Sequence, residues 1–299
     1  MKLARQPIDG VLLLNKPVGI TSNAALQKAK WLLNAKKAGH TGTLDPFADG
    51  LLPLCFGEAT KFSAYLLDAD KHYRAVQQLG VTTTTGDPEG EVLATRNIAV
   101  SCPDISAVLP RFRGEIEQIP PMHSALKHQG RPLYEYARAG IEIDRPPRKV
   151  TIRSLDMIEC APPRVVLDVQ CSAGTYIRTL AQDIGAALGC GAHLTALTRT
   201  AVAGFKLEQA HTLAELETLD ASQRLAMLMP ADCLVAHLPA VHLDAPDAAA
   251  LCQGRSIAHP AAEPGLTRVY TAAHTFLGLA HAESGHLVPR RLIATQQKT

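Results

Sequence analysis

The order of strand-like and helix-like segments constrains the fold of this chain more than any other feature. Residues 9–14 and 164–171 are apolar strand candidates, and residues 71–80 alternate between apolar and polar side chains as a half-buried strand does. Helical spacing of apolar residues occurs over residues 24–33 and 176–188. Strands and helices are therefore mixed without a steady β–α–β rhythm. This order predicts an α+β fold with a mixed, mostly antiparallel sheet.

A second, smaller unit is predicted at the C-terminal end. The 299 residues suit two domains, since a domain typically takes about 100–200 residues. From residue 240 onward, short strand candidates are separated by Gly, Pro and Ser, a pattern typical of a small β-rich domain. These candidates are residues 240–243, 266–270, 276–280 and 286–288. We therefore divide the chain into a domain of residues 1–232 and a β-rich domain of residues 233–299.

Composition excludes several classes of protein. Hydrophobic residues make up 46% of the chain and charged residues 19%, which is typical of an ordered core. The formal net charge of +2 excludes a polybasic or a strongly acidic protein. The apolar run of residues 11–14 is shorter than the roughly 7–15 residues of a secretory signal. No stretch reaches the ~18 apolar residues of a membrane helix.

The spacing of the cysteines indicates whether they bind zinc, form disulfides or stay reduced. All seven are scattered, and none forms a CxxC pair. This spacing argues against a zinc site and against a disulfide framework. We therefore expect reduced thiols and a cytoplasmic protein.

The Gly-rich loop of residues 39–46, GHTGTLDP, is the first segment that indicates chemistry. Asp45 precedes Pro46, which favours an extended or turn conformation, and the two glycines permit backbone angles that other residues resist. An aspartate held in this way is suited to act on a ligand, although Asp before Pro also caps ordinary turns. His40 and Asp45 would make half of a metal site. Because no third ligand follows at helical spacing, we expect no metal.

Arg178 is a second candidate, because it lies where a strand leads into a helix. It falls in the first turn of the helix predicted over residues 176–188, beside Tyr176. An arginine near a buried carboxylate forms a bidentate ion pair and keeps the carboxylate ionised. The alternative is an arginine on a solvated helix face.

Residues 111–153 form a basic segment. They hold nine Lys or Arg against five acidic residues, a local net charge of +4, and Tyr and His side chains are interleaved with them. Basic residues and stackable rings are what an RNA backbone and splayed bases require. An ordinary solvated surface of mixed charge is the alternative.

The longest motifs extend over nearly the whole chain. They are NKPVGITS at 15–22, GHTGTLDPFADGLLPLCFGEATKFS at 39–63, DKHYRA at 70–75, RFRGEIEQIPPMHSALKHQGRPLYEYARAG at 111–140 and CSAGTYIRTLAQDIGAALGCGAHLTALTR at 171–199. The chain thereby resembles the TruB type of bacterial tRNA pseudouridine synthase, which isomerises the uridine at position 55 of the T-loop. The resemblance implies the pseudouridine synthase fold with a PUA-like C-terminal domain, and it favours a functional Asp45 over a turn cap.

The resemblance also implies roles for three residues. Asp45 matches the essential aspartate of the family, and a carboxylate can attack either carbon 6 of uracil or the anomeric carbon of the ribose. Tyr73 matches the tyrosine that stacks on the target base and assists the loss of the proton from carbon 5. Arg178 matches the arginine that pairs with the aspartate, so that Asp45 stays ionised and oriented.

Five further residues match substrate-binding positions. Tyr176 and Leu197 match residues that line the uracil pocket. His40 matches the histidine that enters the T-loop and replaces displaced bases by stacking. Lys16 and Lys61 lie within matching motifs, where each would make either a phosphate contact or a structural contact.

The expected partner is the T-arm of tRNA. An insertion of about residues 113–153 would clamp the RNA, and the C-terminal domain would extend the contact along the tRNA. The resemblance implies no cofactor, no membrane and no protein partner, and a monomer is expected. His123 and Ala173 depart from the family pattern, which has an aromatic residue and a lysine at these positions.

Two other functions stay open at this point. A tRNA-folding chaperone would open and re-close the tRNA elbow without modifying it. A guide-dependent pseudouridine synthase of the ribosomal type would share the core. That type needs partner-binding extensions, which we do not expect in a chain of this length.

Overall fold

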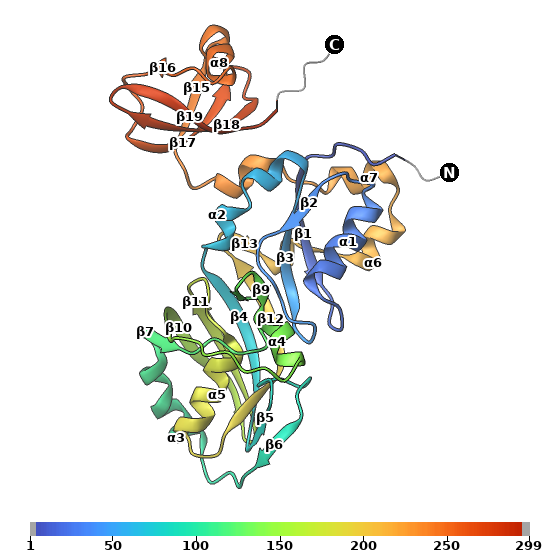
Figure 1. Ribbon diagram of the computed structural model, residues 1–299, viewed down its shortest axis with the longest axis vertical. Coiled ribbons are helices and arrows are strands. Elements are labelled where there is room, and N and C mark those ends of the chain that lie inside the picture. Colours follow the sequence, from blue (N-terminus) through green and yellow to red (C-terminus); the bar gives the residue numbers. More distant parts are fainter. Residues whose placement is uncertain (1–3, 295–299) are drawn as a thin grey trace.

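The computed structural model describes residues 4–294, which form two main sheets with helices packed around them (Figure 1). The larger sheet runs in the order β14–β1–β3–β12–β4–β11–β10–β7, with β13 beside β12 and β2 beside β3. Only the pairs β1–β14 and β3–β12 are parallel among these described strands. The predicted α+β fold with a mixed, mostly antiparallel sheet is therefore confirmed.

The strands of the larger sheet are β1 (Gly10–Lys16), β2 (Ala38–His40), β3 (Asp49–Phe56), β4 (Lys71–Leu79), β7 (Gly114–Gln118), β10 (Arg148–Ala161), β11 (Arg164–Cys171), β12 (Ala192–Val202), β13 (Phe205–Lys206) and β14 (His211–Thr212). Two hairpins stand apart from it: β5 (Val81–Thr83) with β6 (Val92–Thr95), and β8 (Lys127–His128) with β9 (Arg131–Pro132). The α-helices around it are α1 (Ser22–Leu32), α2 (Ala64–Leu67), α3 (Cys102–Val108), α4 (Leu133–Arg138), α5 (Ile177–Ala187), α6 (Leu213–Thr218) and α7 (Ala221–Ala226). Four 3-10 turns complete this part: η1 (Gly57–Lys61), η2 (Leu109–Phe112), η3 (Leu207–Gln209) and η4 (Ala231–Val235).

The smaller sheet has the order β15–β17–β18–β19–β16 and lies at one end of the molecule (Figure 1). Its elements are β15 (Ala240–Leu243), α8 (Ala245–Cys252), β16 (Ile257–Ala258), β17 (Gly265–Thr271), β18 (Phe276–Glu283) and β19 (His286–Leu292). The four predicted strands are present. Helix α8 was not predicted, although Asp244 caps it by accepting from the Asp247 N–H at 2.9 Å.

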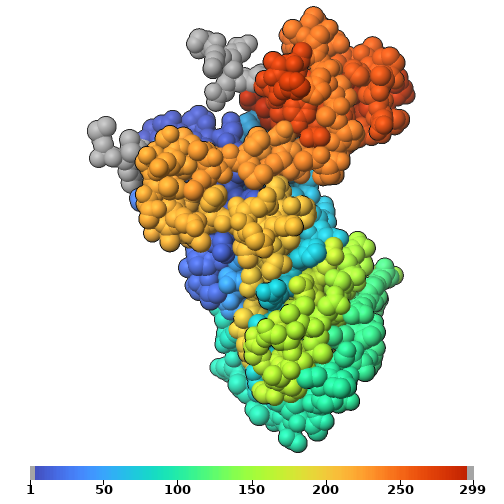
Figure 2. Space-filling view, turned by 180° about the vertical axis from the view of Figure 1, so that it is seen from behind, coloured from blue at the N-terminus to red at the C-terminus, as the bar shows by residue number. Residues whose placement is uncertain are grey.

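The junction between the two sheets packs against the larger body. The predicted domain boundary, between residues 232 and 233, falls inside η4. Leu234 and Val235 of η4 are buried in one apolar cluster with Val11 and Phe62. Figure 2 shows the yellow-to-orange segment that precedes the smaller sheet lying against the blue N-terminal part. The boundary itself stays a prediction.

Part of the Gly-rich loop predicted over residues 39–46 is a strand. Residues 39 and 40 belong to β2, because Gly39 pairs with Cys55 of β3 across the sheet. The segment after β3 forms η1 and then α2. Glu58 and Lys61 of η1 bind the end of the smaller sheet, through the Ala294 N–H and the Leu292 carbonyl. These pairings are tertiary, so local spacing does not reveal them.

Strands β4 and β12 form the centre of the larger sheet and carry residues of interest. Side chains of β4 alternate between buried and partly exposed, as its sequence predicts. The register places Tyr73 opposite Arg199 and Ala75 opposite Leu197. These four positions therefore lie together in the middle of the sheet.

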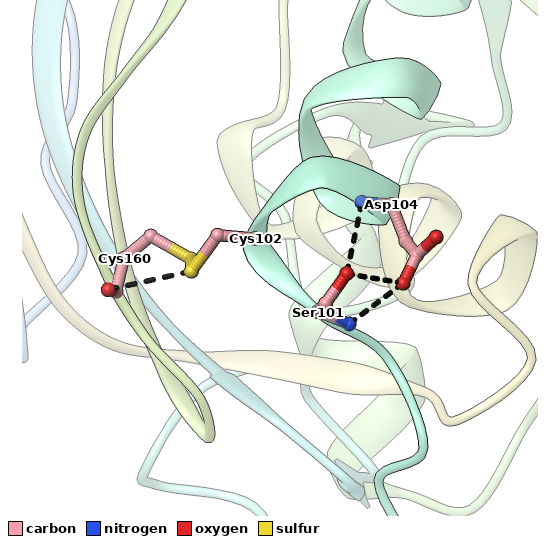
Figure 3. Close-up of a disulfide and its surroundings, with 4 residues drawn as sticks. All are labelled: Ser101, Cys102, Asp104 and Cys160. Atoms are coloured by element: carbon pink, nitrogen blue, oxygen red, sulfur yellow. Dashed lines mark hydrogen bonds between the residues drawn. A yellow bond between two sulfur atoms is a disulfide. The ribbon is translucent and has the colours of Figure 1, made fainter.

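A disulfide joins Cys102 and Cys160, so the expectation of reduced thiols is wrong for this pair (Figure 3). Cys102 begins α3, whose first turn is held by a capping box between Ser101 and Asp104, and Cys160 lies near the end of β10. Their Cα atoms are 5.9 Å apart across 58 residues of sequence. Such a separation gives no sequence signal. The other five cysteines, all within residues 4–294, are free.

Reduction of this disulfide is expected to destabilise the protein. The closed loop of 58 residues includes the whole basic insertion, and a cross-link of this kind contributes about 2–4 kcal/mol by restricting the unfolded chain. Urea unfolding with and without a thiol reductant measures the difference. The Cys102→Ser, Cys160→Ser double variant is the control, because its midpoint should be low and independent of reductant. A wild-type midpoint that reductant leaves unchanged would contradict the prediction.

Within residues 4–294, no helix is long and apolar enough to cross a membrane.

Candidate active site

A cavity of about 250 Å³ opens beside the centre of the larger sheet. Its walls come from the Asp45 loop, from β4 and β12, from the junction of β11 and α5, and from residues 124–125 of the insertion. Ligand pockets for drug-sized molecules measure about 300–1,000 Å³, so this cavity suits a group no larger than a nucleoside.

The Asp45 loop is fixed to helix α1 by one serine. The Ser22 hydroxyl accepts from the Leu44 N–H at 2.8 Å and donates to the Leu44 carbonyl at 3.0 Å. Gly42 has a φ of +102°, which a side chain would strain. The carboxylate of Asp45 does not cap its own turn. Its Oδ2 lies 3.0 Å from Nε of Arg178, and 34% of the side chain is exposed.

Arg178 is buried, with 4% of its surface exposed, so it does not lie on a solvated helix face. It is the second residue of α5, which begins directly after the N-cap residue Tyr176. Besides Asp45, its guanidinium contacts Oδ2 of Asp87 at 3.2 Å and donates to the carbonyls of Thr85 at 3.1 Å and His123 at 2.7 Å. This set of contacts orients the guanidinium toward Asp45.

Sequence reasoning missed Asp87. Its carboxylate is almost fully buried and shares Arg178 with Asp45. A signal was available, because GDPEG at residues 86–90 places an aspartate before a proline in a Gly-flanked turn, as GTLDP does for Asp45. Nothing local shows that the two turns meet at one arginine.

The expected ion pair of Arg178 with Asp45 is present, and two further groups act on the pKa of Asp45. Burial raises the pKa of the Asp45 carboxyl above its ordinary value, Arg178 opposes this rise, and Asp87 adds to it. The net direction of the pKa shift is upward. Desolvation outweighs the ion pair, because the carboxylate lies in the wall of a cavity.

The structure brings the other predicted pocket residues to the same cavity. Tyr73 on β4, Leu197 on β12 and Tyr176 before α5 all line it. Burial raises the pKa of the Tyr73 phenol, so the phenol is neutral. The backbone of Tyr176 is held by Gln118 of β7, whose side chain accepts from its N–H at 3.0 Å and donates to its carbonyl at 3.2 Å.

His40, Lys16 and Lys61 do not line this cavity. His40 is partly buried on β2, and burial lowers the pKa of its imidazole. Lys16 is fully buried, burial lowers its pKa to about 8, and its ammonium donates to the carbonyls of Pro17 at 2.8 Å and Ile20 at 2.7 Å. Lys61 binds Glu58 at 2.7 Å. Either a phosphate contact or a structural contact was expected of these two lysines, and the contacts that they make in the structure are structural.

Within residues 4–294, no group of three or more His, Cys, Asp or Glu side chains is placed to hold a metal ion.

Two solved structures of complexes contain chains of similar fold. One is entitled "Crystal Structure of a Cbf5-Nop10-Gar1 Complex"; the matching chain is 31% identical with a TM-score of 0.69, over 91% of this chain and 78% of that one. A second is entitled "Structure of H/ACA RNP bound to a substrate RNA containing 2'-deoxyuridine". Its matching chain is 27% identical with a TM-score of 0.71, over 95% of this chain and 84% of that one.

Three family models match in succession. Residues 30–177 match "TruB family pseudouridylate synthase (N terminal domain)", residues 178–236 match "tRNA pseudouridylate synthase B C-terminal domain", and residues 239–293 match "Pseudouridine synthase II TruB, C-terminal". The fold and these matches define the class of the protein, which is a pseudouridine synthase.

Curated relatives identify the family within this class. A tRNA pseudouridine synthase B of Thiobacillus denitrificans is 77% identical over 99% of this chain and 100% of its own length. Another, of Chromobacterium violaceum, is 56% identical over 98% of this chain and 97% of its own length. The chain belongs to the TruB family of pseudouridine synthases.

Proposed function

We propose that this protein converts the T-loop uridine at position 55 of tRNA to pseudouridine, with Asp45 as the nucleophile and without a cofactor. The observation that carries the proposal is the Asp45 carboxylate held 3.0 Å from Arg178 in the wall of a cavity that suits one nucleoside. The relatives named tRNA pseudouridine synthase B support tRNA as the substrate.

The reaction detaches uracil from its ribose, turns it and rejoins it through carbon 5. Asp45 attacks either carbon 6 of the ring or the anomeric carbon of the ribose. Tyr73 stacks on the base and assists the loss of the proton from carbon 5. Arg178 orients the carboxylate through its four contacts, while Tyr176 and Leu197 enclose the ring.

Access to the cavity requires the target base to leave its stack, which costs a few kcal/mol. The basic insertion is suited to hold the opened RNA arm, because its residues 124–125 border the cavity. Arg131 and Arg138 lie over the rings of Tyr136 and Tyr134, at 4.9 and 5.4 Å. We further propose that residues 1–232 carry the chemistry and that residues 233–299 extend the contact along the tRNA.

His40→Ala is expected to impair action on a folded T-arm more than on an RNA whose T-loop is already open. An imidazole that replaces a displaced base contributes ~1–3 kcal/mol of stacking, which corresponds to roughly 5–150-fold in rate. Burial favours the neutral ring by lowering its pKa. The measurement is kcat/KM on the two RNAs. Equal losses on both would show that His40 does not replace displaced bases.

The acid limb of the pH profile, where the reaction rate falls as pH is lowered, is expected at a higher pH than an aspartate of ordinary pKa would give. Only ionised Asp45 is a nucleophile, and its pKa is raised. Asp87→Asn removes a negative charge that contributes to this rise, so the limb should move to lower pH. Single-turnover rates against pH at saturating RNA measure it.

Asp183→Asn is the matched control for this pH profile. Burial raises the pKa of Asp183 to about 6, but this residue does not line the cavity. If the acid limb of the pH profile moves in Asp183→Asn and stays in place in Asp87→Asn, the pKa of Asp45 does not determine that limb.

We propose further that the protein acts as a monomer in the cytoplasm without a protein partner. The Cbf5 chain whose title names Nop10 and Gar1 is longer, since this chain covers 78% of it. The chaperone alternative is not favoured, because the curated relatives carry the name of a synthase.

The proposed function is tested by release of tritium from carbon 5 of uracil in a T-arm stem-loop RNA. One RNA carries the tritium at position 55 and a matched RNA carries it at every other uridine. Release from the first RNA alone is expected. Binding without release from either RNA would support a chaperone, and release from the second alone would place the target elsewhere in the arm.

A further inference from the structure

Arg199 is a buried cation that the described protein leaves without a counter-ion. Only 1% of its surface is exposed, and it borders the same cavity as Asp45. Its Nε donates to the Leu51 carbonyl at 2.7 Å, whereas its Nη2 has no hydrogen-bond partner. Among residues 4–294, no carboxylate lies within ion-pair distance of Arg199, whereas Arg178 has two.

The backbone holds Arg199 in this place. Gly50 of β3 lies beside it in the sheet with a φ of +101°, and a Cβ on Gly50 would lie 2.4 Å from the Arg199 carbonyl oxygen. The absence of a side chain at this position lets the two strands approach. Arg199 also stands opposite Tyr73 on β4, so its guanidinium and the phenol occupy one wall.

The charge of Arg199 acts on the groups around it. It contributes to lowering the pKa values of His40 and Lys71, and it opposes the rise that burial causes at Tyr73. The charge of Arg199 thus favours the neutral forms of His40 and Lys71 and the ionised form of Tyr73. An unpaired buried charge is costly, and the cost falls when an anion enters the site.

We propose that Arg199 stabilises the negative charge that the uracil ring carries while it is detached from the ribose; this inference rests on the proposed function. When the bond between C1′ and N1 breaks, its electron pair stays with the ring and is shared by N1 and the carbonyl oxygens. The pair that then forms the C5–C1′ bond comes from the ring. The proton leaves C5 and N1 gains one, so the product is an isomer.

The assignment does not depend on where Asp45 attacks. Addition of the carboxylate to carbon 6 places negative charge in the ring, and displacement at the anomeric carbon releases the ring as an anion. Both routes need a cation beside the base. Arg178 is neutralised by Asp45 and Asp87. Among residues 4–294, Lys71 and Arg199 also border the cavity without a carboxylate within ion-pair distance. The ammonium of Lys71 donates to the carbonyls of Leu67 and Ala69, whereas Nη2 of Arg199 has no partner, so Arg199 is the cation left to act on the ring.

Two substitutions separate charge from structure. Arg199→Gln removes the charge and keeps most of the side-chain length, and we expect kcat to fall about 10²–10³-fold, the loss typical of one preorganised electrostatic donor. Arg199→Lys keeps the charge and should restore most of kcat. The dissociation constant for T-arm RNA, measured by filter binding, should be the same in all three proteins.

A double-mutant cycle tests whether Arg199 acts only by placing Tyr73. If it does, Arg199→Gln will cause no further loss of single-turnover rate in a Tyr73→Phe background, and the proposal is overturned. We expect a further loss, because the charge acts on the ring directly. Equal losses in Arg199→Lys and Arg199→Gln, with equally lowered melting temperatures, would also overturn the proposal and leave a structural role.

Failure of the inference and failure of the proposed function are distinguishable. If wild type releases no tritium from T-arm RNA, the proposed function fails and the Arg199 assignment fails with it. If wild type releases tritium and Arg199→Gln does so at the same rate, only the assignment to Arg199 is wrong.

Discussion

Asp45→Asn is expected to reduce tritium release from T-arm RNA by about 10⁴-fold or more, with RNA binding intact. Asparagine keeps the shape of the side chain but offers no carboxylate to attack carbon. The carboxylate is 34% exposed at the cavity, where a substrate can reach it, and no second carboxylate of residues 4–294 lines the cavity to replace it. Single-turnover rates measure the loss, and filter binding confirms that RNA still binds.

Asp87→Asn is the matched control for this result. Both aspartates precede a proline, and both contact the guanidinium of Arg178, but only Asp45 lines the cavity. A much smaller loss is therefore expected for Asp87→Asn. If the two substitutions cost the same, or if Asp45→Asn keeps its activity, Asp45 is not the nucleophile.

What the sequence predicted well was local. Apolar spacing predicted α5 and the alternating strand β4, because each element repeats one buried face along a short segment. The long motif around Asp45 and the motif GTYIR indicated that Asp45 and Arg178 belong to one site. Their ion pair, across 133 residues of sequence, follows from the resemblance and not from any local pattern.

What the sequence missed was tertiary. Asp87 reaches Arg178 from a turn 91 residues away, and Cys160 reaches Cys102 across 58 residues. Neither spacing is periodic, so no local rule detects it. Arg199 lay inside a matched motif, yet its lack of a counter-ion is visible only once the neighbouring strands are in register.

Removal of Arg178 is expected to have the second-largest effect. Arg178→Met leaves Asp45 and the buried Asp87 without their shared cation, and breaking a buried ion pair costs about 3–5 kcal/mol. We expect the free energy of unfolding to fall by about 3 kcal/mol at neutral pH, because Asp45 is partly solvated. Activity should fall at least about 10³-fold, since the nucleophile loses its orientation.

The pH dependence of stability and activity in Arg178→Met shows whether the losses come from the missing positive charge. Arg178 lowers the pKa of Asp45, so its removal should raise that pKa further and move the acid limb to higher pH, opposite to the shift in Asp87→Asn. The loss of stability should shrink as pH falls, because protonation of the Asp45 carboxyl removes uncompensated charge. Adding Asp87→Asn to Arg178→Met should recover part of the stability and little of the activity. Urea unfolding at several pH values measures these changes, and a loss of stability independent of pH would assign Arg178 a packing role instead.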